Sequence, residues 1–235
     1  MTGDREEKLR DLERRLGHRF ADVSLLDRAL THASLANETA ALHRVDNEAL
    51  EFLGDAVLGM IVTDLLHRRD PDGAEGAKSR RRALLVSAPS LARRAAGLGL
   101  PELLLLGRGE EKTGGREKTA LWANAYEALV AALYLDGGFE AAHRFVGEEF
   151  AHEAEAPDQE LEDPKSRLQE LLQGQGRPVP LYLVVGEEGP SHRRRFLVEC
   201  RLDDGVVTTG EGASKKAAQQ EAARGALVRL REPKP

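Results

Sequence analysis

Apolar residues recur at the three- and four-residue spacing of helices through most of the first 150 residues. The clearest pattern starts at Asn47 and reads NEALEFLGDAVLGMIVTDLL, which predicts a largely buried helix as far as about His67. A second strong pattern, ALWANAYEALVAALYLDGG, predicts another helix, and Gly137 with Gly138 is predicted to end it. The predicted first domain, residues 5–150, is therefore a mainly α helical bundle.

Shorter helices are predicted around these two segments. Val23 to Leu30 reads as a short amphipathic helix. Pro71 predicts a break after the first buried helix, SRRRALLVS opens the next helix, and Pro89 suits the first turn of another. The charged, glycine-rich segment GRGEEKTGGREKTA at 107–120 is predicted to be an exposed loop.

The pattern changes after residue 150. Residues 151–162 are acidic and lack apolar periodicity, so they are predicted to be a linker. Residues 163–233 begin with a short amphipathic helix, continue with three strand-like segments and close with a helix that has Ser214 as a plausible N-cap. The order α-β-β-β-α predicts a small α+β domain with both helices on one face of a sheet.

Composition is typical of a soluble, helix-rich protein, with 41% hydrophobic, 31% charged and 4% aromatic residues among 235. The single cysteine, Cys200, excludes an intramolecular disulfide framework and fits a reducing, cytoplasmic setting. The N-terminal stretch is charged throughout, which argues against a signal peptide. No segment approaches the roughly 18 continuous apolar residues of a membrane helix.

Charge is unevenly distributed along the chain. Residues 165–235 hold 13 Lys and Arg against 9 Asp and Glu, a net charge of +4. Because the whole chain carries −6, residues 1–164 carry −10. A basic C-terminal domain on an acidic body suggests that the C-terminal domain binds a polyanion.

Acidic residues gather on one face of the first buried helix. Glu48, Glu51 and Asp55 are three, four and seven residues apart, so they stack on that face and repel one another. Asn124 and Glu127 lie three residues apart on the second buried helix. If the two helices cross, these oxygen ligands converge into a site that suits Mg²⁺ or Mn²⁺ better than zinc. An ordinary solvated acidic face is the alternative, and the residues alone leave both open.

The segment NEALEFLGDAVL resembles the signature of the ribonuclease III family, whose usual form is NERLEFLGDSVL. ALTHAS before it, EGAKSRRRALLVS after it and LWANAYEALVAALYLDGG also resemble the family, as do DPKSRLQELLQ and GEGASKKAAQQEAA of its double-stranded-RNA-binding domain. The resemblance covers about residues 5–230. It implies a ribonuclease III-type catalytic bundle, a linker and a double-stranded-RNA-binding domain of the bacterial type.

The resemblance implies roles for individual acidic residues. It makes Asp55 and Glu127 catalytic, with a metal held by Glu51, Asp55, Asn124 and Glu127. It relates Glu48 and Glu75 to further acidic positions at the cleavage site and dimer interface. Many members carry Asp where this chain has Asn124, and an amide oxygen ligates Mg²⁺ without a negative charge, so we expect weaker metal binding.

The family hydrolyses phosphodiesters in double-stranded RNA, leaving 5′-phosphate and 3′-hydroxyl ends, and it works as a homodimer. The expected cofactor is therefore Mg²⁺, with Mn²⁺ as a substitute and no small-molecule cofactor. Phe52, Leu53 and Gly54 are candidates for an apolar dimer contact, with Gly54 allowing close approach, although an ordinary core explains the same pattern. Expected substrates are ribosomal RNA precursors and some messenger RNAs.

The resemblance also implies RNA contacts in the C-terminal domain, which reads duplex shape, 2′-hydroxyls and phosphates. The matching residues are Gln169 and Gln173 on its first helix, His192 between two strands, and Lys215 and Lys216 after Ser214. Two rival interpretations are a catalytically impaired double-stranded-RNA-binding protein, which Asn124 alone favours, and a structural protein that uses the helical domain only to dimerise.

Overall fold

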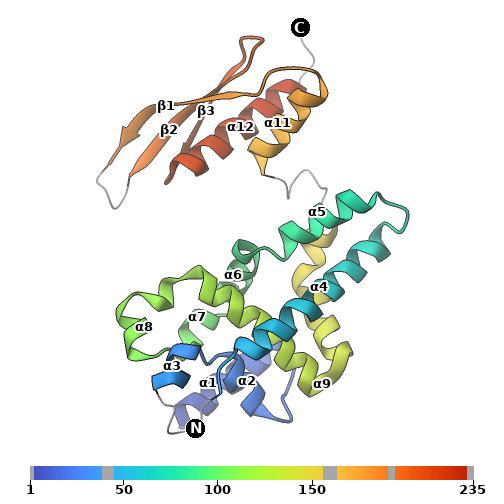
Figure 1. Cartoon of the computed structure of the whole chain (residues 1–235), viewed down its shortest axis with the longest axis vertical. Coiled ribbons are helices and arrows are strands. Elements are labelled where there is room, and N and C mark those ends of the chain that lie inside the picture. Colours follow the sequence, from blue (N-terminus) through green and yellow to red (C-terminus); the bar gives the residue numbers. More distant parts are fainter. Residues whose placement is uncertain (1–2, 39–44, 156–162, 190–193, 232–235) are drawn as a thin grey trace. The chain divides into compact units, whose positions relative to one another are not determined.

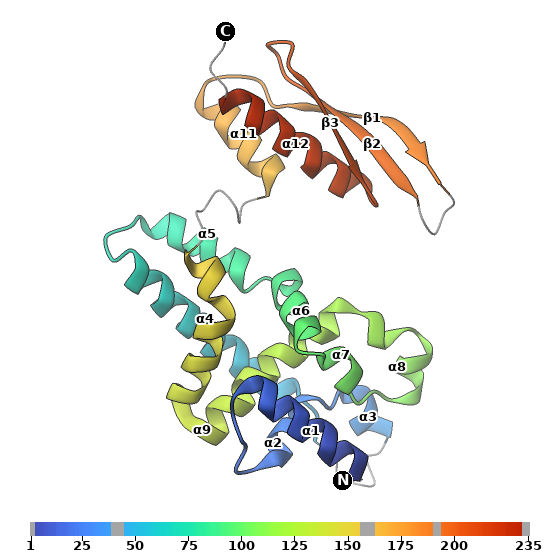
Figure 2. The ribbon, with the colours of Figure 1, turned by 180° about the vertical axis from the view of Figure 1, so that it is seen from behind.

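The chain divides into two compact units, residues 1–157 and residues 158–235. In the computed structural model, residues 3–38, 45–155, 163–189 and 194–231 are described (Figures 1 and 2). The first unit is helical and the second combines two helices with a sheet, as the sequence predicts. None of the helices within these ranges is long and apolar enough to cross a membrane.

The helical unit is built from helices of very different lengths, two of which form its centre. Its elements, in chain order, are α1 (Gly3–Leu16), α2 (Val23–Ala29), α3 (Ala33–Glu38), α4 (Glu48–Arg69), α5 (Glu75–Leu85), α6 (Ala88–Gly97), α7 (Leu100–Leu103), α8 (Arg108–Lys112), the 3₁₀ helix η2 (Gly115–Glu117) and α9 (Thr119–Glu155).

Helix α9 lies at the centre of this unit. Every residue from Ala128 to Leu133 is fully buried, and so are Ala125 and Tyr126. A helix that is apolar on all sides must be surrounded by other elements, and α4 crosses it while α6 and α2 pack beside it (Figure 1). The predictions of two buried helices and of a short helix at Val23 are confirmed.

Helix α9 bends sharply at Gly138, where the backbone has φ 71° and ψ −174°. This left-handed conformation suits glycine because a side chain would strain it. The sequence predicts that the helix ends here, and a helical segment does end, but the chain resumes helix directly and continues to Glu155. Just before the bend, the Asp136 carboxylate accepts hydrogen bonds from the His18 side chain and from the Ala21 and Asp22 N–H groups.

The predicted linker at 151–162 is wrong for its first five residues, which belong to α9. Their sequence lacks apolar periodicity, but tertiary contacts stabilise the helix end. The Arg81 side chain, from α5, donates a hydrogen bond to the Glu153 carbonyl, and Arg94, from α6, donates one to the Glu149 carbonyl and stacks on Phe150. Residues 156–162 lie outside the described ranges, so the linker itself stays a prediction.

Two other local predictions are corrected. The segment 107–120, predicted as an exposed loop, forms α8 and η2 and begins α9. Its first N–H groups donate hydrogen bonds to the Ser34 hydroxyl and the Glu38 carboxylate, about 70 residues away, and composition does not reveal these contacts. Helix α5 begins at Glu75, four residues before the predicted SRRR start. Pro89 does lie in the first turn of α6, as predicted.

The second unit has the predicted order α-β-β-β-α. Its elements are α11 (Pro164–Gly174), β1 (Leu181–Glu188), β2 (Arg195–Arg201), β3 (Val207–Gly212) and α12 (Lys215–Arg231). The strands form one antiparallel sheet in the order β1-β2-β3, and both helices cover the same face (Figures 1 and 2).

The core of the second unit lies between this sheet and its helices. Apolar residues from all layers meet there: Leu168 and Leu172 of α11, Cys200 of β2, and Ala222, Ala223, Ala226 and Leu227 of α12, with Leu202 beside them. Helix α12 begins as predicted, because the Ser214 Oγ accepts a hydrogen bond from the Ala217 N–H. Cys200 is a buried core residue.

Candidate active site

The two acidic helices of the helical unit touch at Gly54. A Cβ atom placed on Gly54 would lie 1.8 Å from the Glu127 carbonyl oxygen, so only glycine lets α4 approach α9 this closely. Glu51 and Asp55 lie beside this contact on α4, and Asn124 and Glu127 lie beside it on α9. The crossing therefore brings together the four residues that the sequence proposes as metal ligands.

The close packing of acidic residues where α4 crosses α9 changes the pKa of two of them. Burial, followed by repulsion from Asp55 and Glu51, raises the pKa of the Glu127 carboxyl to about 7. Burial and the neighbouring Glu48 also raise the pKa of Glu51, although a hydrogen bond with the Asn124 side chain opposes this shift. Three carboxylates thus lie close enough to disfavour one another's charge.

The chemistry of these donors fits a hard divalent cation. Carboxylate and amide oxygens are the ligands that Mg²⁺ takes, and a cation at the crossing would relieve the repulsion that raises the pKa of Glu127. Across the described part of the chain, no three Asp, Glu, His or Cys side chains already enclose a metal position.

The two remaining acidic candidates occupy different places. Glu48 is the first residue of α4 and is exposed, one turn from Glu51. Glu75 begins α5 beyond the other end of α4, where its carboxylate accepts a hydrogen bond from the Ser79 hydroxyl at 2.7 Å. About 20 Å of helix separate Asp55 from the end of α4 at a rise of 1.5 Å per residue. Within one chain, Glu75 does not join the carboxylate cluster.

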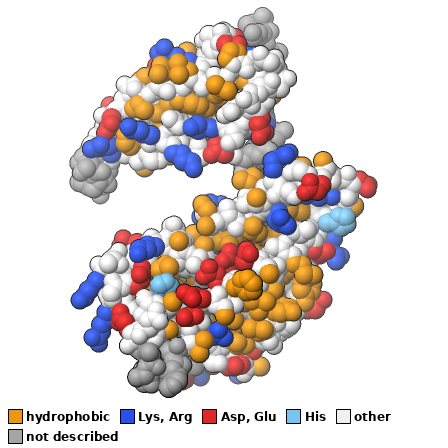
Figure 3. Space-filling view, viewed as in Figure 1, with side chains coloured by type: hydrophobic (Ala, Val, Ile, Leu, Met, Phe, Trp, Pro, Cys, Tyr) orange, Lys and Arg blue, Asp and Glu red, His pale blue; other side chains and the backbone are white. Residues whose placement is uncertain are grey.

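An open groove runs along α4 from Asp55 toward α5. It is lined by Asp55, Gly59, Met60, Thr63, His67 and Arg82, and a second hollow continues from Arg82 to Glu75. Acidic side chains gather on this unit beside apolar ones (Figure 3).

Exposed apolar residues lie close to the acidic cluster in sequence. The side chains of Phe52, Met60 and Leu135 are 83%, 62% and 49% exposed. Gly54, in contrast, is buried against α9. The suggestion that Gly54 allows close approach to a partner subunit is wrong, because the backbone of Glu127 already occupies that space.

Sequence reasoning missed the groups that hold the start of α4. The buried Asn47 donates its backbone N–H to the Thr31 carbonyl at 2.9 Å and its side-chain amide to the Ala29 carbonyl at 3.2 Å. His32 is the residue after Thr31, and its charge opposes the rise in the pKa of the Glu51 carboxyl. The only sequence signal was the segment ALTHAS ahead of the acidic helix.

The second unit presents the residues proposed to bind RNA. Gln169 and Gln173 lie one turn apart on α11, and both are exposed. Lys215 and Lys216 are the first residues of α12 and are also exposed. The Lys215 Nζ lies 5.7 Å from the centre of the Phe196 ring. His192 lies outside the described residues.

Both units match known families. Residues 22–154 match the ribonuclease-III-like family, and residues 164–230 match the double-stranded RNA binding motif. The nuclease domain of ribonuclease III from Campylobacter jejuni, described in connection with a region involved in dimer formation, is similar in structure. The TM-score is 0.54 and the identity 39%, over 60% of this chain and 97% of that one.

Relatives matched over nearly their whole length belong to the same family. The chain is 46% identical to Ribonuclease 3 of Bdellovibrio bacteriovorus, over 93% of this chain and 94% of the relative. It is 45% identical to Ribonuclease 3 of Magnetococcus marinus, over 99% and 97% of the two chains. It is 48% identical to Ribonuclease 3 of Symbiobacterium thermophilum, over 91% and 90%. The chain therefore belongs to the ribonuclease III family and joins a ribonuclease III domain to a double-stranded-RNA-binding domain.

Proposed function

We propose that this protein is a Mg²⁺-dependent endoribonuclease that hydrolyses phosphodiester bonds in double-stranded RNA and leaves 5′-phosphate and 3′-hydroxyl ends. The observation that carries the proposal is the contact at Gly54, which gathers three carboxylates and one amide from two helices. The family membership of the whole chain supports the same reaction. Precursors of ribosomal RNA and some messenger RNAs are the proposed substrates, and the cytoplasm is the proposed location.

In this proposal the crossing of α4 and α9 holds the cation. Glu51, Asp55, Asn124 and Glu127 would supply its ligands, with Asp55 and Glu127 indispensable. Bound Mg²⁺ would lower the pKa of a water molecule and neutralise charge that develops on the phosphate. The buried helices would hold the backbone that carries these ligands in place. Glu48, one turn away, adds negative charge at the edge of the site.

We further propose that two copies of the chain associate through the exposed apolar residues near the acidic helix. The side chains of Phe52 and Met60 on α4 are 83% and 62% exposed, and exposed apolar patches mark association surfaces. Because Glu75 lies at the start of α5, far from the cluster of its own chain, its proposed place is beside the duplex or the partner subunit.

The second unit would hold the duplex. Gln169 and Gln173 from α11, together with His192, are proposed to reach the minor groove. Lys215 and Lys216 are proposed to bind phosphate at the start of α12, where backbone N–H groups also point outward.

The proposal is tested with a long labelled RNA duplex, compared with single-stranded RNA and duplex DNA, with and without Mg²⁺. Wild type is expected to cut only the RNA duplex and only with Mg²⁺, and Glu127→Gln is expected to bind the duplex without cutting it. Glu140→Gln, an exposed glutamate on the same helix, is the matched control and should cut normally. Tight duplex binding by wild type with no cutting at any Mg²⁺ or Mn²⁺ concentration would favour the alternative, a catalytically impaired RNA-binding protein.

A further inference from the structure

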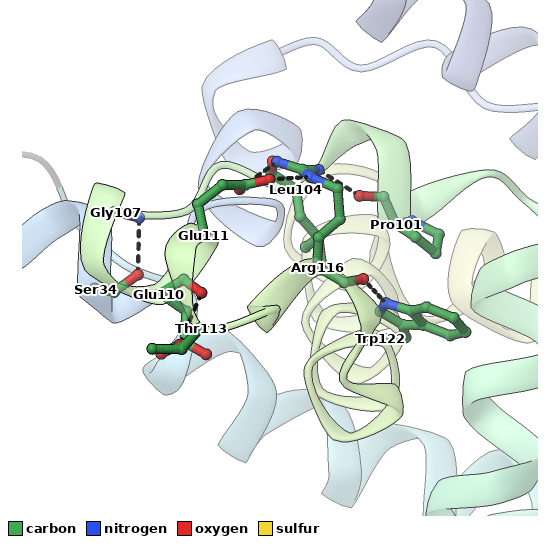
Figure 4. A network of polar contacts seen from close by, with 9 residues as sticks. All are labelled: Ser34, Pro101, Leu104, Gly107, Glu110, Glu111, Thr113, Arg116 and Trp122. Atoms are coloured by element: carbon green, nitrogen blue, oxygen red, sulfur yellow. Dashed lines mark hydrogen bonds and ion pairs between the residues drawn. The ribbon is translucent and has the colours of Figure 1, made fainter. Parts of the chain in front are cut away.

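Arg116 connects three parts of the helical unit through its guanidinium group (Figure 4). Its Nε and Nη2 donate to the two oxygens of Glu111 at 2.8 and 2.9 Å, a paired arrangement that only a planar guanidinium makes. Its Nη1 donates to the Pro101 carbonyl at 2.6 Å, and Nη2 also donates to the Leu104 carbonyl at 3.1 Å. Arg116 therefore binds α8 to the end of α7.

The backbone of Arg116 is tied to the acidic helix α9. The Trp122 indole Nε1 donates a hydrogen bond to the Arg116 carbonyl at 2.7 Å (Figure 4). Trp122 lies in the first turn of α9, two residues before Asn124. Beside it, Lys118 forms an ion pair of 2.7 Å with Glu110 of α8. The first turn of α9 is thus held from outside the helix, by groups that Arg116 fixes.

The starts of both acidic helices depend on the same short backbone segment, residues 30–32. The Leu105 N–H donates to the Leu30 carbonyl at 2.8 Å, and the His32 N–H donates back to the Leu105 carbonyl at 3.0 Å. The neighbouring Thr31 carbonyl accepts the N–H of Asn47, the residue before α4, at 2.9 Å. Leu105 follows directly after Leu104, whose carbonyl Arg116 binds.

We infer that Arg116 is a positioning residue that sets where the first turns of α9 lie relative to α4, and thereby places Asn124 opposite Glu51. This inference rests on the proposed metal site. A ligand set built from two helices needs both helices in register, and a shift of about 1 Å in catalytic groups lowers rates roughly 100-fold. Arg116 acts through the Pro101 and Leu104 carbonyls, through Glu111 and through Trp122, and none of these is a proposed ligand.

A rival role for Arg116 is contact with an RNA phosphate, since 35% of its side chain is exposed. Arg116→Lys separates the two roles, because lysine keeps the charge but cannot replace the fork on Glu111 or both carbonyl bonds. Glu111→Gln tests positioning from the other side and leaves Arg116 in place. Trp122→Phe removes the indole N–H donor from the link to α9 and keeps an aromatic ring, although a smaller one, at that position.

Steady-state cleavage gives the first measurement. All three variants are expected to lower kcat roughly 10- to 100-fold, to leave the KM for the duplex unchanged and to raise the Mg²⁺ concentration for half-maximal cutting. Arg108→Lys, the same substitution at an exposed arginine of α8, is the matched control and should behave as wild type. A wild-type kcat and Mg²⁺ requirement in Arg116→Lys, whose retained charge would preserve a phosphate contact, would identify that contact as the role of Arg116 and overturn the inference.

Fluorescence gives a second measurement that needs neither metal nor RNA. Trp122 is the only tryptophan in the chain, so intrinsic emission reports directly on the start of α9. Arg116→Lys and Glu111→Gln are expected to shift that emission to longer wavelength and to increase acrylamide quenching, with Arg108→Lys unchanged. Emission and kcat that both match wild type in both variants would overturn the inference.

The outcomes separate this inference from the proposed function. If wild type fails to cut duplex RNA, the proposed function fails, while the fluorescence shift still tests whether Arg116 holds the helix start. If wild type cuts and Glu111→Gln cuts equally well with unchanged emission, only the inference fails. Should Arg116→Lys unfold, Glu111→Gln and Trp122→Phe carry the same kinetic test.

Discussion

In each unit of the molecule a glycine lets a helix backbone lie closer to its neighbour than a side chain would allow, and the two contacts serve different ends. In the helical unit, Gly54 of α4 meets the Glu127 carbonyl of α9. In the RNA-binding unit, a Cβ on Gly210 of β3 would lie 2.2 Å from the Ala222 nitrogen of α12. Both glycines let backbones approach, but one brings charged groups together and the other packs an alanine-rich helix against a sheet.

The two contacts have opposite effects on the stability of their units. Around Gly210 the neighbours are small and apolar, with Ala218, Ala222 and Ala226 fully buried, so close packing there only stabilises the fold. Around Gly54 burial, and after it repulsion between neighbouring carboxylates, raises the pKa of Glu51 and Glu127, which opposes folding while the carboxylates carry charge. The apolar interior of α9 offsets that repulsion.

The largest effect is expected from Gly54→Ala. The added Cβ would overlap the Glu127 carbonyl, so α4 and α9 must separate. Overpacking of this kind costs about 1–3 kcal/mol or more, and moving the carboxylates by about 1 Å should lower cleavage roughly 100-fold. Denaturant unfolding and single-turnover cleavage measure the two effects.

Gly59→Ala is the matched control on the same helix, since nothing lies within 4 Å of its added Cβ. Alanine favours helix, so this variant should gain about 0.5–1 kcal/mol of unfolding free energy. Equal stability changes for the two alanine variants would show that the crossing is not tight at Gly54.

Gly210→Ala is expected to break the second contact without disturbing the first. The added Cβ meets backbone atoms of α12, and we expect a loss of about 1–3 kcal/mol confined to the RNA-binding unit. Calorimetry of the full chain should show that unit melting earlier, and duplex binding should weaken.

The corresponding control is Gly225→Ala on α12, where the added Cβ would lie at an ordinary 3.4 Å from the Thr208 side chain. It should leave duplex affinity unchanged. If Gly210→Ala instead lowers the stability of both units equally, the two contacts are not independent.

A smaller effect is expected from removing both lysines at the start of α12. Lys215→Ala with Lys216→Ala should weaken binding to duplexes of every sequence, and the slope of log affinity against log salt should fall by about 2. Arg224→Ala, farther along the same helix, should change the slope less. A slope that matches wild type would exclude the two lysines as phosphate contacts.

The smallest effect is expected from Asn124→Asp, which tests how negative charge near Gly54 affects stability and metal binding. It removes the amide that hydrogen bonds to Glu51 and adds a fourth negative charge. Without metal, the protein should lose about 1 kcal/mol of stability, while cutting should reach half-maximal rate at a several-fold lower Mg²⁺ concentration. Asn124→Asp with an unchanged Mg²⁺ requirement would argue against Asn124 as a ligand.

Much of the site could be predicted because helical spacing is local. Glu48, Glu51 and Asp55 share a face for the same reason that the apolar residues of α4 share another, and the acidic pair on α9 follows the same rule. Arg116 and Trp122 could not be predicted in this way. Their partners lie in the short helices α7 and α8 and in η2, and segments of three to five residues are too short to show a periodic pattern.

The errors have a related cause. Residues 151–155 read as linker because composition registers only local preference, whereas Arg81 and Arg94 bind carbonyls at that helix end from distant helices. Residues 107–120 read as an exposed loop because glycine and charge dominate there. Gly54 was predicted to lie at a subunit contact. A glycine in a sequence indicates that the backbone can pack closely against another element, but it does not identify that element.

The sequence alone determined the two long buried helices, the α-β-β-β-α order of the second unit, which carboxylates share a helix face, and which family the chain resembles, since periodicity and motif spacing are local properties of the chain. Only the tertiary structure decided that α4 meets α9 at Gly54, that Glu75 stays apart, and that Arg116 holds the start of α9. Those facts depend on contacts between residues far apart in sequence, which form only when the helices pack and exclude water.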